Sequence, residues 1–291
     1  MPRDSESLKL LKVINGSYQP KRDEVYKLAE RARLNKLYLA YLRRVGEVLR
    51  DELELEESRF KWFMQNTLEV ARTLKDVDYA LYKFRRPVDH VSVDLDILVN
   101  TRDIPRAVKS LRERGFMIVV SEPYTVTMER RGFIVDLYTM PSFAWIVYMD
   151  GYKLIREHAI DMELWDTTVR ALCREAEVAV AAAHAIYKEH LVLLMDCLVV
   201  WRWLSAKAWE VAIELSVEDA LKGLLGACDL VKRGLAEAPY RLKPHMLARA
   251  CLGKALDDPA FRATLLNALR YLLSRRSVGA EILNRLTRKS Y

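Results

Sequence analysis

Two aspartates inside an apolar segment are the residues of this chain best suited to chemistry. Asp94 and Asp96 lie within residues 93–99, a run of apolar and β-branched residues that predicts a buried strand. Side chains two residues apart point to the same face of a strand, so the two carboxylates should lie roughly 7 Å apart. Two like charges on a buried face repel each other and lose hydration. A bound divalent cation would relieve both costs, and the pattern therefore predicts a metal site.

A third carboxylate is expected on a neighbouring strand. Asp136 lies between apolar neighbours in the β-rich segment 133–138. If this segment pairs beside 93–99, the three carboxylates converge on a site for Mg²⁺ or Mn²⁺, hard cations that also take phosphate oxygens. We predict Asp94, Asp96 and Asp136 as both metal ligands and catalytic residues, with Asp136 as a base towards an attacking hydroxyl. The alternative is that these carboxylates cap turns or pair with arginines.

A basic segment precedes the two aspartates. It contains Lys83, Arg85 and Arg86, and Ser92 stands just before the carboxylate strand. A triphosphate beside a metal needs cationic partners, which lysine and arginine supply, and a serine hydroxyl can add a donor. These residues are therefore candidate phosphate ligands. The alternative is a basic strand end that faces water.

The surrounding elements predict an α+β fold with a small mixed β-sheet between helical flanks. Helices are expected over 22–50 and 52–75, and the period then changes to that of strands at 78–84, 93–99, 116–120, 124–129 and 133–138. A helix over 104–114 crosses the sheet, and Arg131-Gly132 predicts a tight turn. Residues 141–165 are ambiguous. Beyond 167 we expect only helices, at about 174–190, 191–204, 206–214, 217–233, 243–255, 258–274 and 278–288.

Composition narrows the functional class. The chain has 291 residues, 51% of them hydrophobic, with a net charge of +7, which favours a folded protein with an anionic partner such as a nucleotide or RNA. Charged residues make up 30% of the chain, and asparagine and glutamine are scarce, which is a thermophile-like signature.

The four cysteines form no close pairs and are expected to be buried, reduced thiols. No signal peptide or membrane span is evident, so we expect a soluble cytoplasmic protein.

Basic residues are frequent near the C-terminus. They are Arg270, Arg275, Arg276, Arg285, Arg288 and Lys289. Such a cluster is either a nucleic-acid footprint or an ordinary charged helical surface.

The order of these motifs resembles the polymerase-β-like nucleotidyltransferase superfamily. A strand, a loop, the pattern h-D-h-D-h-h-h at 93–99, a helix and a later strand with Asp136 are typical of it, and the resemblance covers roughly residues 78–200. Within the superfamily the chain is similar to uncharacterised bacterial and archaeal nucleotidyltransferase-like proteins, a branch that includes toxins of toxin–antitoxin pairs. The resemblance implies Mg²⁺- or Mn²⁺-dependent transfer of an NMP group from an NTP to a hydroxyl or phosphate acceptor, with RNA or a protein as candidate acceptors.

The change from helices to strands and back to helices predicts a domain division, and the resemblance suggests two further site residues. An N-terminal helical arm would span 1–75, the nucleotidyltransferase-like core 76–170 and a C-terminal helical domain 171–291. In similar proteins a helical segment after the sheet lines the cleft, which implies that Lys188 meets nucleotide phosphate and that Asp196 orients it or the cleft wall. His184 lies one helical turn before Lys188. The alternative for these residues is a hydrogen bond or salt bridge between helices.

One feature departs from the superfamily pattern. The Gly-Ser that normally ends the first strand and holds the triphosphate is replaced by Lys83-Phe84. Either Lys83, Arg85 and Arg86 take over the phosphate role, or the protein is an altered or inactive member that serves as a nucleotide- or RNA-binding scaffold. A toxin-like transferase acting on tRNA ends is a third reading, which rests on the basic charge and the family branch.

Overall fold

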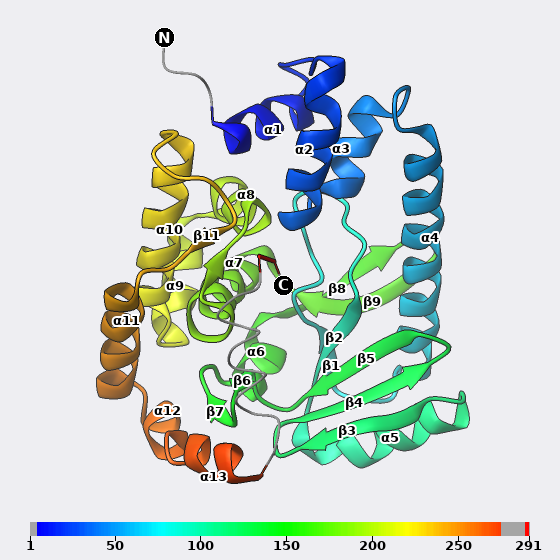
Figure 1. The fold of residues 1–291 in the computed structure, drawn as a ribbon. Coiled ribbons are helices and arrows are strands. Elements are labelled where there is room, and N and C mark those ends of the chain that lie inside the picture. Colours follow the sequence, from blue (N-terminus) through cyan, green and yellow to red (C-terminus); the bar gives the residue numbers. More distant parts are fainter. Residues whose placement is uncertain (1–4, 275–288, 291) are drawn as a thin grey trace.

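The computed structural model describes residues 5–274 and 289–290. A mixed sheet lies between a long helix on one side and a group of C-terminal helices on the other, with short N-terminal helices above both (Figure 1). The predicted α+β class, with helices flanking a mixed sheet on both ends of the chain, is confirmed.

In the described part of the chain the main sheet has 7 strands in the order β3-β4-β5-β2-β1-β9-β8. Their bounds are β1 Tyr79–Leu81, β2 Asp94–Val99, β3 Met117–Glu122, β4 Thr125–Arg130, β5 Phe133–Tyr138, β8 Ala159–Leu164 and β9 Thr167–Leu172. The pairs β2–β5 and β1–β9 are parallel, and the others are antiparallel. The predicted turn between β4 and β5 is confirmed, with φ of 52° at Arg131 and 80° at Gly132.

Two strands of this sheet escaped prediction. The expectation of helices only beyond residue 167 was wrong, because β9 runs there beside β1 and β8 completes a hairpin with it. Strand β8 lies in the ambiguous stretch 141–165, and β9 directly precedes the helical run that begins at residue 174. Tertiary pairing with β1 decides the conformation of β9.

The period of two along β2 and β5 divides their side chains between two cores. Leu95, Ile97 and Val99 pack with Phe63 and Leu68 of helix α4 (Arg50–Thr73) and with α5 (Ile104–Glu113), which cover one face of the sheet. The intervening positions of β2 face the other way, where Leu98 packs beneath the C-terminal helices. The alternation therefore sends Asp94 and Asp96 to the face opposite α4 and α5.

The N-terminal helices are α1 (Glu6–Ile14), α2 (Arg22–Leu34) and α3 (Tyr38–Val45). A single helix over 22–50 was predicted, and this was wrong because the chain breaks at Lys36, whose φ is 58°. The three helices pack around Leu10, Leu28 and Leu42, together with Leu194 and Leu198 of the C-terminal part. The arm thus rests on residues far away in sequence, and the division at residues 75 and 170 stays a prediction.

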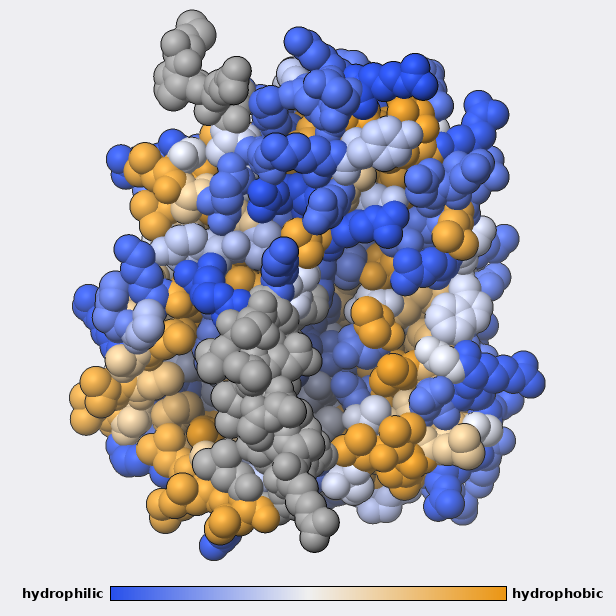
Figure 2. Space-filling view, viewed as in Figure 1, coloured by the Kyte–Doolittle hydropathy of each residue, from blue (hydrophilic) through white to orange (hydrophobic). Residues whose placement is uncertain are grey.

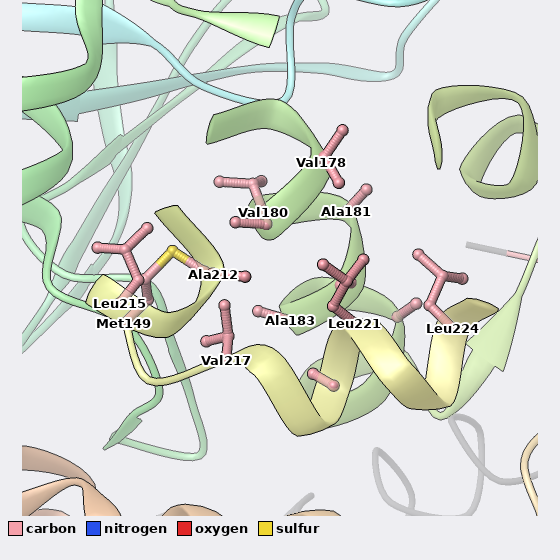
Figure 3. Close-up of a cluster of buried hydrophobic side chains, with 14 of the residues drawn as sticks. Met149, Val178, Val180, Ala181, Ala183, Ala212, Leu215, Val217, Leu221 and Leu224 are labelled. Atoms are coloured by element: carbon pink, nitrogen blue, oxygen red, sulfur yellow. The ribbon is translucent and has the colours of Figure 1, made fainter. Parts of the chain in front are cut away.

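The C-terminal helices bury a small-residue core against the sheet. They are α6 (Gly151–His158), α7 (Arg174–Ala183), the π-helical turn His184–Glu189, α8 (Leu194–Trp203), α9 (Ala206–Glu214), α10 (Glu218–Lys232), α11 (Pro244–Asp257), α12 (Pro259–Thr264) and α13 (Asn267–Ser274). Figure 3 shows Val180 and Ala183 of α7 packed among Ala212, Val217 and Leu221. A helix that is apolar on all sides is expected at such a buried position.

Most of the predicted C-terminal helices are confirmed within a few residues. The exceptions are 174–190, which ends in the π-helical turn, and 258–274, which is split between α12 and α13. The predicted helix 278–288 lies outside the described residues. Short strand pairs β6–β7 (Ser142–Phe143 and Ile146–Val147) and β10–β11 (Leu191–Val192 and Tyr240–Arg241) complete the architecture. No helix in the described ranges has the length and apolar character needed to cross a membrane.

The cysteines correct one expectation. Cys197 and Cys228 form a disulfide with a Cα–Cα distance of 5.4 Å, whereas Cys173 and Cys251 are free. The prediction of four reduced thiols was wrong for this pair, because the two residues stand 31 positions apart and only the packing of α8 against α10 brings them together.

Candidate functional site

Three carboxylates converge on the face of the sheet opposite α4 and α5. Strand β5 lies beside β2 in parallel, and the register places Asp136 directly across from Asp96. Asp94 points to the same face two residues earlier, and carboxylate oxygens of all three residues lie within 4.8 Å of one another. The predicted pairing of 133–138 with 93–99 is confirmed, and the roles of the three residues stay a prediction.

The carboxylates open into a large cavity between the sheet and the helical parts. Its volume is about 1060 Å³, and its wall includes Lys83, Lys188 and all three carboxylates. The N-terminal helices, α4 and the loop before β2 contribute further cations, which are Arg33, Lys36, Arg59, Arg85 and Arg86. Figure 2 shows that hydrophilic side chains also dominate the surface over the N-terminal helices, whereas hydrophobic ones gather over the region of α11 to α13. A wall that combines carboxylates with many cations suits a polyphosphate bound through a metal.

Hydrogen bonds from neighbouring side chains orient two of the carboxylates. Thr127 on β4 donates to Asp136 Oδ1 over 2.5 Å, and the Tyr138 hydroxyl donates to Oδ2 over 3.3 Å. Ser92, predicted as a phosphate ligand, instead places its hydroxyl 3.4 Å from Asp94 Oδ1. These contacts fix the carboxylates in the cavity wall before any ligand binds.

Burial dominates the acidity of the site. Asp96 is 7% exposed, and burial raises the pKa of its carboxyl to about 6, although the charge of Lys83 acts in the opposite direction. Burial also raises the pKa of Asp136, and the hydrogen bond from Thr127 opposes this rise. Burial therefore destabilises the charged forms of Asp96 and Asp136, and a bound cation would offset this cost.

The donor set fits a hard divalent cation. Asp96 Oδ1 is buried and has no hydrogen-bond partner, so this oxygen has an unused ligand position facing two further carboxylates. In the described residues a second group of ligand atoms comes together at Glu157, His158 and Glu214. Its carboxylates are already paired with Lys153 and Arg156. Both glutamates are also exposed, whereas the triad contains a buried carboxylate oxygen without a hydrogen-bond partner, so the triad is the better metal site.

Proton competition gives a first test of the triad. Below pH 6 Asp96 takes up a proton, which must leave before an ion can bind, so the affinity for Mn²⁺ should fall about fivefold between pH 6 and pH 5. Above pH 7 the affinity should be nearly constant. Calorimetric titration of the metal-free protein with Mn²⁺ from pH 5 to 8 measures this profile. An affinity independent of pH over this range would contradict Asp96 as a ligand.

Lys83 lies against the carboxylates rather than facing the cavity opening. The predicted strand 78–84 ends early, because β1 stops at Leu81 and Lys83 adopts a φ of 56°. Its ammonium lies 2.8 Å from Asp96 Oδ2, and both side chains are buried. Burial lowers the pKa of Lys83, but the charges of Asp96 and Asp94 outweigh this effect and raise it overall.

A buried glutamate that sequence reasoning missed holds the turn after Lys83. Glu177 on α7 accepts hydrogen bonds from the backbone N–H groups of Phe84 (3.0 Å) and Arg85 (3.3 Å). Burial raises the pKa of its carboxyl to about 7, although the charge of Arg86 opposes the rise. The available signal was a single glutamate inside the run of alanines and valines at 176–183. Through Glu177, helix α7 positions Arg85 and Arg86 in the cavity wall.

The structure brings Lys188 to the site but not Asp196. Lys188 lies in the π-helical turn, lines the cavity, and places its ammonium 5.5 Å from the centre of the Tyr138 ring. Asp196 instead accepts a hydrogen bond from the backbone N–H of Leu193 over 2.9 Å at the start of α8. It caps that helix and lies outside the cavity wall as far as the chain is described. His184 Nε2 lies 3.3 Å from Glu189 Oε1, and burial lowers the pKa of the imidazole well below its usual value, so this is a contact of a neutral ring and not a salt bridge.

Lys36 is a further cavity residue that the sequence did not indicate. It stands at the break between α2 and α3, and burial together with the charges of Arg86 and Lys83 lowers its pKa to about 8. In the sequence it is one lysine among many in a basic helical region, so no local pattern distinguishes it. Of the predicted C-terminal basic cluster, Arg275, Arg276, Arg285 and Arg288 lie outside the described residues.

Comparison with known proteins agrees with this geometry. Residues 90–231 match the model of a family described as an uncharacterised nucleotidyltransferase. The matched segment is just under half of the chain and includes the three carboxylates, Glu177 and Lys188, but begins after Lys83. No curated protein matches the chain. The segment from 90 to 231, which carries the carboxylate triad, is therefore nucleotidyltransferase-like, as the sequence resemblance predicted.

Proposed function

We propose that this protein is a Mg²⁺- or Mn²⁺-dependent nucleotidyltransferase that moves an NMP group from an NTP to a hydroxyl or phosphate acceptor. The observation that carries the proposal is the convergence of Asp94, Asp96 and Asp136 within 4.8 Å, beside an unpaired buried oxygen. The family match over 90–231 supports the same reaction class. RNA and protein remain the candidate acceptors, and the cations around the cavity favour an anionic one such as RNA.

The roles of the chain's residues follow from their positions. Asp94, Asp96 and Asp136 would hold the ion, which when bound neutralises charge on the phosphates and orients them. Asp136 accepts the proton of the acceptor hydroxyl, and burial favours this because it raises the pKa of its carboxyl. The acceptor oxygen bonds to the α-phosphorus, the bond from that phosphorus to the bridging oxygen breaks, and pyrophosphate leaves with the bond electrons.

Phosphate binding is assigned to the cations of the cavity wall. Lys188, Arg85 and Arg86 offer ammonium and guanidinium groups to the triphosphate, in place of the superfamily's missing Gly-Ser. The charge that develops on the leaving pyrophosphate is stabilised by the same groups. Asp196 caps α8 with one carboxylate oxygen, and its charge acts on Lys36 in the cavity wall, so its predicted role in orienting that wall stays a prediction.

The proposal is tested by transfer of label from each of the four α-³²P-labelled NTPs, with Mg²⁺ or Mn²⁺, to RNA or protein in a cell extract. We expect labelled macromolecules that disappear with EDTA and with the double variant Asp94→Ala/Asp96→Ala. Absence of label with every NTP, together with no metal-dependent NTP binding by calorimetry, would overturn the enzyme.

A second function is favoured by one contact. The ion pair between Lys83 and Asp96 occupies part of the carboxylate site, as would suit a scaffold that binds nucleotide or RNA without catalysis. Such a protein would bind RNA with an affinity that falls steeply with salt, and its NTP binding would not depend on metal. The same calorimetric titrations, repeated with RNA over a salt series, separate the two functions.

A further inference from the structure

We infer that the ammonium of Lys83 takes the place of one cation in the carboxylate triad, so that this site holds one divalent ion rather than two. The inference rests on the proposed function and specifies how its metal site is built. It starts from a contact that the superfamily pattern does not imply, since Lys83 stands where a Gly-Ser is expected.

The side chain of Lys83 is fixed in place by its neighbours. Its Nζ lies 2.8 Å from Asp96 Oδ2, and the two side chains are only 10% and 8% exposed. The rings of Tyr82 and Tyr138 lie 5.2 and 5.8 Å from the ammonium, and aromatic faces stabilise a cation at such distances. The group is therefore enclosed by the site and is not a mobile surface lysine.

The backbone at Lys83 is held in an unusual conformation that directs this side chain towards Asp96. Lys83 has a φ of 56°, a conformation that costs free energy for a residue with a Cβ. The two peptide N–H groups that follow are held by the buried carboxylate of Glu177. Since the chain maintains an unfavourable backbone conformation with a dedicated buried acceptor, the position of Lys83 against Asp96 is a built feature of the fold.

The charges of the three carboxylates and of Lys83 do not cancel. Three carboxylates carry three negative charges, and Lys83 offsets one of them, which leaves the charge that one divalent ion neutralises. Two-metal sites keep their ions about 3.5–4 Å apart between shared carboxylates. Here one oxygen of Asp96 is already bonded to an ammonium, and only its Oδ1 is unpaired. While Lys83 is in contact with Asp96, the positive charge of its ammonium repels a second divalent ion from Oδ2.

In the proposed reaction, one ion and the cations of the chain would therefore share the neutralisation of the phosphate charges. Asp94, Asp96 and Asp136 would hold one ion, and the chain's own cations would neutralise the charge on the leaving group, which a second ion does in two-metal sites. Lys188 is well placed for this, because it shares the Tyr138 ring with Lys83 from the cavity wall.

The experiment counts ions directly. The full-length protein is stripped of metal and titrated with Mn²⁺ at pH 8, and free Mn²⁺ is measured by electron paramagnetic resonance. We expect one Mn²⁺ per wild-type chain and two per Lys83→Met chain, the second with a dissociation constant of millimolar or tighter. The matched control is Arg59→Met, which removes a cavity cation that is paired with Glu56 at 2.6 Å rather than with the triad. This control should bind one ion.

Two ions on the wild-type chain, or one ion on both the wild-type and Lys83→Met chains, would overturn the role of Lys83 and leave the proposed function standing. No ion on the wild-type chain would remove the metal site itself, and with it the proposed function. Circular dichroism and a thermal melt check that Lys83→Met is folded, and the wild-type count does not depend on any variant.

Discussion

Asp96→Asn should lower the rate of nucleotidyl transfer by about 10³-fold, or about 4 kcal/mol of transition-state stabilisation. The substitution keeps the shape of the side chain but removes the negative charge. Asp96 is the central carboxylate, paired in register with Asp136 and carrying the unpaired buried oxygen. Its loss should therefore weaken both the binding of the metal and the charge stabilisation that the metal provides. The measurement is kcat/KM at saturating Mg²⁺, together with the Mn²⁺ affinity.

The matched control for this prediction is Asp89→Asn. Asp89 lines the same cavity, but its carboxylate is paired with Arg43 at 2.6 Å on the exposed side. Loss of an exposed ion pair changes little, so this variant should keep its rate within about twofold. If Asp96→Asn retained more than a tenth of the wild-type rate, the triad would not be the catalytic centre.

The second large effect is expected on stability. Glu177→Ala should lower the free energy of unfolding by about 3 kcal/mol at pH 6, because the N–H groups of Phe84 and Arg85 lose their acceptor in a buried place. Glu177→Gln keeps an acceptor oxygen and should stay within about 1 kcal/mol of wild type at this pH. Urea denaturation of the three proteins measures the difference. Glu210→Ala, at an exposed position on α9, is the control and should change stability by less than about 0.5 kcal/mol.

The same residue predicts how stability depends on pH. Burial raises the pKa of Glu177 from its ordinary 4.5 to about 7, so between these values the folded protein keeps a proton that the unfolded chain releases. The stabilising contribution is therefore complete below pH 4.5 and is lost as the pH rises through 7, by about 3 kcal/mol in total. Wild type should lose stability relative to Glu177→Gln over this window and then level off. Parallel stability curves for the two proteins would show that Glu177 does not titrate there.

The predictions for Asp96 and Glu177 depend on contacts that the sequence alone does not reveal. The pattern at 93–99 identified Asp94 and Asp96, because a period of two in an apolar run is a local property of the chain. The β-rich run at 133–138 identified Asp136 in the same way. The strands of the β3–β5 region and the turn at Arg131 were predictable for the same reason. The sequence thus determined which carboxylates are available and which strands carry them.

Only the tertiary structure decided which other side chains and backbone groups these residues contact. Only the pairing of β5 with β2 sets Asp136 across from Asp96, and only the packing of α7 under the sheet brings Glu177 to the turn that aims Lys83 at the carboxylates. The helix cap formed by Asp196 could not be read from the sequence for the same reason, and neither could strand β9, which pairs with β1 about 90 residues earlier in the chain. These features depend on contacts between residues far apart in the chain, whose energies exceed the weak local preferences that a sequence pattern reports.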